Sequence, residues 1–160
     1  MQPKYTLKVK WLIVAGALLF ATPATAQPSK VIDIDMGGTV AWYVDRYKAD
    51  ARAGTHFIIK RYCASACTVI LGIIPRERVC VEPAAAMGFH SGYNFFEFWH
   101  SPATTRLMLR YYDADVRADL VNFFNWRGNT PHTEVMWLRA GRYYRICGQP
   151  VSGPTGITKD

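Results

Sequence analysis

The sequence predicts an α/β fold, in which helices pack on a sheet, for residues 27–147. Strand patterns and helix patterns alternate along this part of the chain, which is typical of crossover units that place helices on the faces of a sheet. Glycine and proline residues separate the predicted elements. Of the 160 residues, 134 follow position 26. That length is enough for one hydrophobic core and too short for two, so we expect a single domain.

Two strand and helix pairs are predicted in the first half of this segment. Apolar and acidic residues alternate over residues 31–35, which predicts a strand, and the Gly-Gly pair after it predicts a turn. A helix is expected at 40–53, because aromatic and alanine residues recur there at helical spacing before Gly54. The β-forming residues at 56–62 predict a second strand, and the apolar run at 68–74 predicts a short buried helix.

The second half begins with two short strands, expected at 78–81 and 87–90. Ser101 followed by Pro102 is a typical helix start, so one long helix is expected from there towards Arg127. The remaining expectations are a shorter helix at 131–140, a last strand at 142–146 and a flexible polar tail at 148–160.

The first 26 residues have the pattern of a cleavable secretory signal. Lysines precede an apolar run at 11–20, and the small residues Ala24-Thr25-Ala26 provide a cleavage site before Gln27. A membrane span needs about 20 apolar residues, and this run has half that number, so an uncleaved anchor is the less favoured alternative. We therefore expect export to the periplasm, or secretion.

The charge of the chain argues against a nucleic-acid partner. The formal net charge is +7, and three of the lysines lie in the predicted signal, which leaves about +4 on the mature part. The remaining basic residues are scattered among acidic and aromatic residues rather than gathered on one segment. We expect no nucleic acid and no cofactor among its partners.

Four cysteines, Cys63, Cys67, Cys80 and Cys147, lie in the mature part. An even number of cysteines in an exported chain usually forms disulfides, and three pairings are open. We favour Cys67 with Cys80 and Cys63 with Cys147, because a short helix would return the chain from Cys67 to a neighbouring strand. A zinc site at Cys63 and Cys67 lacks a second close pair, and Cys-x3-Cys is not the Cys-x2-Cys of thiol oxidoreductases, so no metal is expected.

Three features in a fixed order suggest acyl-transfer chemistry. Gly37 and Gly38 follow the first strand, Ser65 lies among small residues at a strand-to-helix turn, and His90 ends a later strand. Hydrolysis through a serine needs an accessible hydroxyl, a base and backbone N–H groups that face the developing oxyanion. Each also has a structural interpretation: Ser65 as a helix cap, His90 as a core histidine and the glycines as a turn.

Four motifs follow one another in a specific order: Asp-Met-Gly-Gly at 35–38, Cys-Ala-Ser-Ala-Cys-Thr at 63–68, Arg-Val-Cys-Val-Glu-Pro at 78–83 and Gly-Phe-His at 88–90. Together they resemble the proteolytic subunit of the Clp protease, and above all its exported Clp-like relatives. The resemblance covers residues 31–145. It implies a Clp and crotonase-like spiral of β-β-α units, which commonly assembles as a trimer or larger ring.

The resemblance also implies roles for single residues. Ser65 corresponds to the nucleophile, His90 to the general base, and the N–H groups of Gly38 and Ala66 to the oxyanion hole, with a peptide or acyl compound as substrate. An ATP-driven partner is not expected, because the unfoldases that serve Clp rings belong to the cytoplasm.

One departure from the family pattern leaves a second class open. The position of the aspartate that orients the histidine in Clp proteases corresponds to Trp137 or a residue beside it, where no carboxylate stands. The carboxylates that could replace it are Asp113, Asp115, Asp119 and Glu134. The chain is then either a serine hydrolase with a Ser-His dyad or an inactive Clp-like binding or scaffold module. The aromatic residues at 93–99 and downstream are expected in the core or a subunit interface, with a substrate groove as the alternative.

Overall fold

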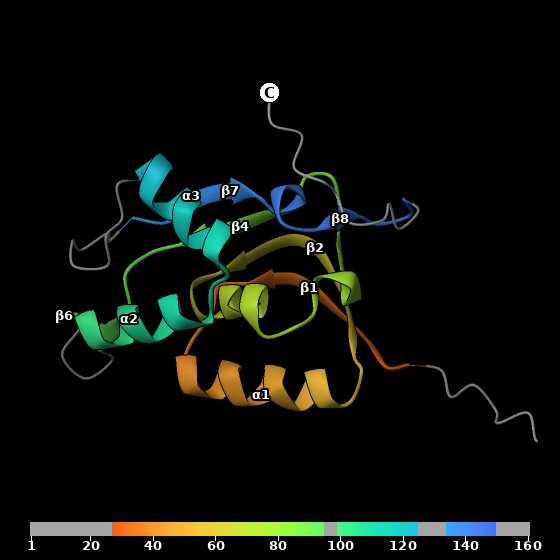
Figure 1. Ribbon diagram of the computed structural model, residues 1–160, viewed down its shortest axis with the longest axis horizontal. Helices are drawn as coiled ribbons and strands as arrows, with labels where there is room; N and C mark the ends of the chain where they lie inside the picture. Colours follow the sequence, from red (N-terminus) through yellow and green to blue (C-terminus); the bar gives the residue numbers. More distant parts are fainter. Residues whose placement is uncertain (1–26, 95–98, 125–133, 150–160) are drawn as a thin grey trace, which may run out of the picture.

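Strand β2 (His56–Ala64) is the central strand of the main sheet. A computed structural model of the chain describes residues 27–94, 99–124 and 134–149. Strand β1 (Ser29–Asp35) pairs with β2 in parallel along one side. On the other side, β3 (Val79–Val81) pairs with the first half of β2, and β4 (Ala86–Phe89) pairs with its second half, both in parallel. The carboxyl ends of β1, β2 and β4 therefore meet at the same edge of the sheet (Figure 1).

Two short strands extend the sheet beyond β3 and β4. Strand β8 (Arg145–Ile146) pairs with β3 in parallel, and β7 (Met136–Arg139) pairs with β4 in the antiparallel direction. A separate two-stranded sheet joins β5 (Tyr93–Asn94) to β6 (Trp99–His100). The main sheet is thus mixed, with β7 as its antiparallel member.

Helices follow the strands of the main sheet and pack against it. Helix α1 (Val40–Arg52) follows β1, and the 3-10 helix η1 (Ser65–Gly72) follows β2 and packs between α1 and α2 (Pro102–Tyr111). Helix α3 (Ala114–Phe124) follows α2 and contributes Val116 and Leu120 to the hydrophobic core. The 3-10 helices η2 (Arg76–Arg78) and η3 (Ala140–Arg142) connect the remaining strands.

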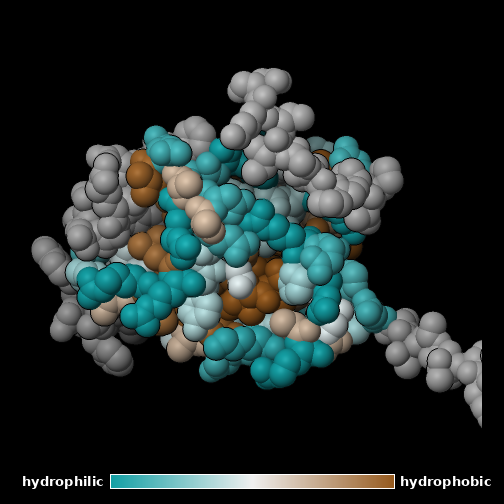
Figure 2. All heavy atoms as spheres, in the orientation of Figure 1, coloured by the Kyte–Doolittle hydropathy of each residue, from teal (hydrophilic) through white to brown (hydrophobic). Residues whose placement is uncertain are grey.

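One continuous hydrophobic core joins these layers. Its members come from strands β1 to β4, from α1, α2 and α3, and from the 3-10 helices η1 and η3. The largest fully buried side chains include Tyr47, Phe57, Ile59, Phe89 and Leu120. Burial of such side chains is the main stabilising contribution to a fold of this size. Figure 2 shows polar residues over most of one face, with apolar residues gathered at its centre.

The α/β prediction is confirmed, and the predicted strands and α1 lie close to their observed positions. The buried helix expected at 68–74 is a 3-10 helix that already begins at Ser65. The long helix expected from Ser101 is broken: Tyr112 adopts an extended conformation and buries its ring, so α2 and α3 are separate helices. Ser101 caps α2 as predicted, since its hydroxyl accepts a hydrogen bond from the N–H of Thr104.

The helix expected at 131–140 is wrong, because its second half forms strand β7 against β4. The predicted signal at 1–26 and most of the tail at 148–160 lie outside the described residues, as does the greater part of the aromatic run at 93–99. Within the described ranges, no helix is long and apolar enough to cross a membrane.

Candidate active site

Ser65 occupies the junction between β2 and η1 in a conformation that side chains rarely adopt. Its φ angle is 55°, and among the described residues other than glycine it alone has a positive φ. For a residue with a Cβ atom, the left-handed conformation costs about 1–2 kcal/mol and persists only where the surrounding structure enforces it. Backbone outliers of this kind gather at functional sites, and a strained strand-to-helix turn is how some hydrolases expose a nucleophilic serine.

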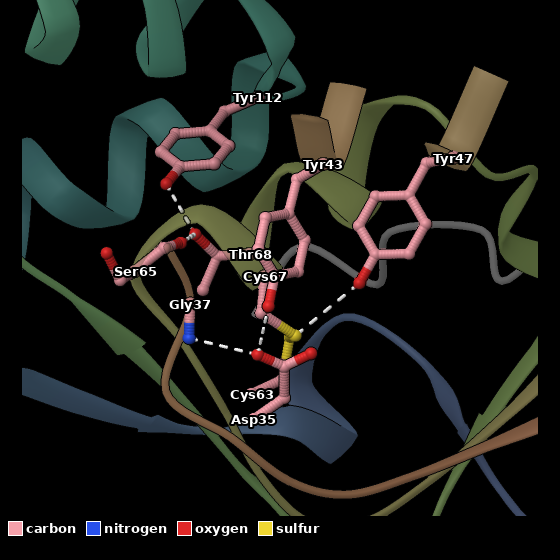
Figure 3. Close-up of a disulfide and its surroundings, with 9 residues drawn as sticks. All are labelled: Asp35, Gly37, Tyr43, Tyr47, Cys63, Ser65, Cys67, Thr68 and Tyr112. Carbon is pink, nitrogen blue, oxygen red and sulfur yellow. Dashed lines mark hydrogen bonds between the residues drawn. A yellow bond between two sulfur atoms is a disulfide. The ribbon is translucent and has the colours of Figure 1, made fainter. Parts of the chain in front are cut away.

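The Gly37 turn packs directly against Ser65. Gly37 has a φ of 85°, and a Cβ atom added there would lie 2.5 Å from the Ser65 Cβ and 2.7 Å from the Ala66 nitrogen. The N–H of Gly37 donates to Asp35 Oδ1 at 2.9 Å, and the Tyr43 hydroxyl donates to the same oxygen (Figure 3). Burial and the Asp35 carboxylate both raise the pKa of Tyr43, so its hydroxyl stays protonated and continues to donate. Asp35 therefore stabilises the Gly37 turn, against which Ser65 packs.

Replacing Gly37 by alanine tests this close packing. Alanine pays the penalty of a positive φ and also collides with the Ser65 turn, so we expect a loss of about 2–4 kcal/mol in the free energy of unfolding. Gly54→Ala is the matched control, because Gly54 has a φ of 72° and the nearest atom to a new Cβ is 3.8 Å away. Urea unfolding of both variants separates the two effects. Equal losses would show that the contact with Ser65 is unimportant.

A buried chain of hydrogen bonds holds the carbonyl of Ser65. The Thr68 hydroxyl donates to the Ser65 carbonyl oxygen at 2.5 Å, so it accepts from the Tyr112 hydroxyl, which lies 2.6 Å away. Burial raises the pKa of Tyr112, which keeps this hydroxyl protonated as the donor. The chain of bonds joins η1 to the segment that separates α2 from α3 (Figure 3).

All four cysteines form disulfides, but the pairing differs from the one we favoured. Cys63 pairs with Cys67, and Cys80 pairs with Cys147. Cys63 and Cys67 flank a turn so tight that their Cα atoms are 5.4 Å apart. Cys147 directly follows β8, which pairs with β3, and its N–H donates to Val81 O, so it lies beside Cys80. The favoured pairing assumed that η1 carries Cys67 across to β3, whereas Cys67 lies in the first turn of η1.

His90 lies at the same edge of the sheet as Ser65. Ala64 of β2 pairs with Gly88 of β4, so the chain after each of these two parallel strands leaves at neighbouring positions. His90 is half-buried, and its Nδ1 lies 2.7 Å from the carbonyl oxygen of Ser91. Because a carbonyl only accepts, Nδ1 carries the hydrogen and Nε2 of the neutral ring keeps its lone pair. Among the described residues, neither ring nitrogen is hydrogen-bonded to Ser65.

The predicted oxyanion-hole residues, Gly38 and Ala66, lie on the two sides of the contact between the Gly37 turn and the Ser65 turn. Gly38 follows Gly37 in the turn, and in the described part of the chain its N–H makes no hydrogen bond. Ala66 is in the first turn of η1, where N–H groups have no acceptor within the helix. A Cβ atom added at Gly37 would lie 2.7 Å from the Ala66 nitrogen, so the glycine turn and Ala66 are neighbours. The anion-binding role of the Gly38 and Ala66 N–H groups stays a prediction.

Trp137, which the resemblance aligns with the orienting aspartate, makes an aromatic contact. Trp137 of β7 pairs with Gly88, and its ring lies 5.3 Å from that of Tyr62, with both residues about two-fifths exposed. A Cβ atom added at Gly88 would lie 2.9 Å from the Trp137 ring. Trp137 therefore covers β4, the strand that leads to His90. An indole ring has no carboxylate oxygen to accept a hydrogen bond from the imidazole, so Trp137 cannot orient the His90 ring as an aspartate would.

None of the four carboxylates considered as substitutes contacts His90 in the part of the chain that the structure describes. Arg76 binds Asp113 and Asp115, and Arg142 binds Asp119. The hydrogen bond from Arg142 lowers the pKa of Asp119, and the one from Arg76 lowers the pKa of Asp115. Glu134 is exposed and lies two residues before β7. Arginine ion pairs therefore hold three of the four acids that were left open as substitutes for the aspartate.

Asp119→Asn should change acid stability and leave the Ser65 site unaffected. A carboxylate with a lowered pKa stabilises the folded state above its unfolded pKa, and this contribution disappears as the pH falls through the folded pKa. We expect a loss of about 1–2 kcal/mol near neutral pH, and convergence with the unchanged protein in strong acid. Urea unfolding across this pH range measures both. An effect on Ser65 reactivity with no change in stability would contradict the structural role.

Sequence reasoning missed the hydrogen bonds that support the candidate site. The bonds from Tyr43 and Gly37 to Asp35, and the Thr68 and Tyr112 chain, were not predicted. An available signal was Asp35 itself, since an acid that ends a strand just before a glycine turn often accepts from the backbone two residues on. The partnership of Thr68 with Tyr112 joins residues 44 positions apart, and no local pattern indicates it.

Comparisons with known proteins return little beyond a similar solved structure. No protein-family profile matches the sequence, and no curated protein matches it. Among solved structures, a point mutant of ClpP1 from Listeria monocytogenes is similar, with 15% sequence identity and a TM-score of 0.42. The similarity covers 74% of this chain and 71% of that chain. What the chain does therefore has to be argued from its own site.

Proposed function

We propose that the chain is an exported serine hydrolase that cleaves peptide or acyl bonds without ATP. The observation that carries the proposal is the left-handed backbone of Ser65, because a strained serine between a strand and a helix is costly unless its placement is used. The ordered motifs that resemble the exported Clp-like proteins support the same conclusion. Assembly as a trimer or larger ring is part of this proposal.

In the proposed mechanism, the Ser65 hydroxyl attacks the substrate carbonyl while Nε2 of His90 removes its proton. The N–H groups of Gly38 and Ala66 stabilise the oxyanion. His90 later returns the proton to the leaving group, and water hydrolyses the acyl-serine by the reverse sequence. In this mechanism the Ser65 hydroxyl and Nε2 of His90 approach to hydrogen-bond distance when the substrate binds, because hydrogen bonds between catalytic groups are often longer in the free enzyme than in the substrate complex.

The Ser91 carbonyl takes one of the two roles of the missing aspartate. An orienting group holds the histidine in the tautomer whose Nε2 is free, and it stabilises the charge that the ring acquires. The carbonyl performs the first role through the 2.7 Å contact with Nδ1. It performs the second only as a dipole, so we propose a slow enzyme rather than an inactive one.

Export is supported by the two disulfides together with the signal-like first 26 residues. Disulfides of this kind persist in oxidising compartments and are rare in the cytosol. When the full chain is produced in a bacterium, the protein recovered from the periplasm should begin at Gln27. Amino-terminal sequencing checks this, and a mature protein that retains residues 1–26 would argue against a cleaved signal.

Covalent capture by a fluorophosphonate tests the activity. The exported protein is treated with the probe, digested, and the labelled peptide is identified by mass spectrometry. We expect the label on Ser65 of the native protein and none after prior unfolding, because only the folded site activates the hydroxyl. Absence of label on a natively folded, disulfide-intact protein would exclude the hydrolase.

The alternative proposal is an inactive Clp-like module that binds a partner in the envelope. The exposed Tyr62 and Trp137 rings favour it, since exposed aromatic pairs are common in binding surfaces. The same labelling experiment separates the two, because a module would leave Ser65 unlabelled while remaining folded.

A further inference from the structure

The Cys63–Cys67 disulfide encloses the strained serine. Between its two half-cystines the chain contains only Ala64, Ser65 and Ala66, and Ser65 alone of these has a positive φ. Both cysteines are completely buried. A bond placed across a turn of this kind restricts the backbone angles of the enclosed residues.

Each end of this disulfide is anchored in a rigid element. Cys63 pairs with Asp35 of β1 and with Met87 of β4, so it is fixed in the middle of three strands. Cys67 lies in η1, and its sulfur is 3.5 Å from the hydroxyl of Tyr47 on α1 (Figure 3). The disulfide therefore ties the strand before Ser65 to the helix after it.

The same bond is poorly placed to stabilise the whole fold. A disulfide restricts the unfolded chain more strongly as the loop that it closes becomes longer. Cys63 and Cys67 are separated by 4 positions, whereas Cys80 and Cys147 are separated by 67. The second disulfide accordingly serves the fold, which leaves a local role for the first.

We propose that the Cys63–Cys67 disulfide is a positioning element that holds Ser65 in its left-handed conformation and so keeps its hydroxyl ready to attack. The statement that the hydroxyl is ready to attack rests on the proposed function, in which Ser65 is the nucleophile. The statement that the disulfide holds the backbone of Ser65 does not depend on that function. Without the bond, the turn relaxes to a negative φ and carries the hydroxyl away from the edge shared with His90.

A double-mutant cycle on stability tests the conformational part without any activity. Ser65→Gly is made in the intact chain and in the variant Cys63→Ala with Cys67→Ala, and urea unfolding gives the four unfolding constants. Glycine relieves the strain only where the disulfide imposes it. We expect the effect of Ser65→Gly to differ between the two backgrounds by roughly five- to thirtyfold in the unfolding constant, equivalent to about 1–2 kcal/mol at 1.36 kcal/mol per tenfold. Effects equal within about twofold would overturn the proposal.

A further comparison covers the case in which the alanine pair does not fold. Cys63→Val with Cys67→Ala fills more of the volume of the two sulfurs and offers a second background. In the intact chain, Ser65→Gly should also be more stable than Ser65→Ala. Both variants lack the hydroxyl, but only alanine has a Cβ atom that makes a positive φ unfavourable. An alanine variant as stable as the glycine variant would show that Ser65 is not held under strain, which overturns the proposal.

Labelling kinetics test the link to reactivity, with the second disulfide as the matched control. The rate of fluorophosphonate capture per folded molecule should fall roughly five- to thirtyfold in Cys63→Ala with Cys67→Ala. In Cys80→Ala with Cys147→Ala the folded fraction should fall more, but the rate per folded molecule should stay within about twofold of the unchanged protein. Equal rates in both pairs would overturn the positioning role.

The two arms distinguish this proposal from the proposed function. If the unchanged protein is not labelled at all, the hydrolase is excluded, while the double-mutant cycle still decides whether the disulfide holds Ser65. If the unchanged protein is labelled and the cycle shows no coupling, the hydrolase stands and the positioning role fails.

Discussion

Ser65→Ala is expected to lower the hydrolysis of an activated acyl ester by about 10³-fold or more while leaving the fold intact. Alanine keeps the Cβ atom and the backbone of the turn, and it removes only the hydroxyl that attacks. Some rate above that of water should remain, because the oxyanion hole and substrate binding still act when a nucleophile is lost. Urea unfolding and the two disulfides should be unchanged, which separates loss of chemistry from loss of structure.

Two further variants make this prediction specific. Ser29→Ala removes an exposed hydroxyl at the start of β1 and should retain full activity. Residues that act as one unit are strongly non-additive, so Ser65→Ala with His90→Ala should be no slower than Ser65→Ala alone. A steady-state assay on the exported protein measures all of these rates. If Ser65→Ala retains the activity, the hydrolysis comes from another group and the assignment is wrong.

The candidate residues Ser65 and His90 could be placed from the sequence because the signals around them are local. A strand that ends in small residues around Ser65, and a short strand that ends at His90, are visible in the order of residue types. The α/β class followed from the same alternation. Parallel pairing of β2 with β4 then brings these two strand ends to one edge without any further information.

The remaining features depend on contacts between distant residues. Residues 136–139 contain good helix formers, yet they form β7 because β4 offers an antiparallel partner for Met136 and Leu138, the more buried residues of that strand. The pairing of Cys80 with Cys147 depends on the pairing of β8 with β3. The spacing of the cysteines in the sequence does not reveal that strand pairing. The break at Tyr112 follows from its ring entering the core and its hydroxyl meeting Thr68.

Gly72→Ala should cost more stability than any other single substitution considered, at least about 3 kcal/mol. Gly72 ends η1, and a Cβ atom there would lie 1.4 Å from the carbonyl oxygen of Tyr111 at the end of α2. A flexible side chain can move aside, but a backbone carbonyl moves only if its helix moves. Gly141→Ala is the matched control, since its new Cβ would meet only the Cδ1 atom of Ile146 at 3.1 Å, and we expect an effect of about 1 kcal/mol or less.

The same substitution should also reach the active site. Displacement of Tyr111 moves its neighbour Tyr112, whose hydroxyl supports Thr68 and, through it, the carbonyl of Ser65. The Gly72→Ala molecules that remain folded should therefore capture the fluorophosphonate more slowly than folded Gly141→Ala molecules. Urea unfolding with labelling at low temperature measures both effects. Full stability in Gly72→Ala would mean that η1 and α2 do not approach as closely as the structure places them, and the support of Ser65 from α2 would fail with it.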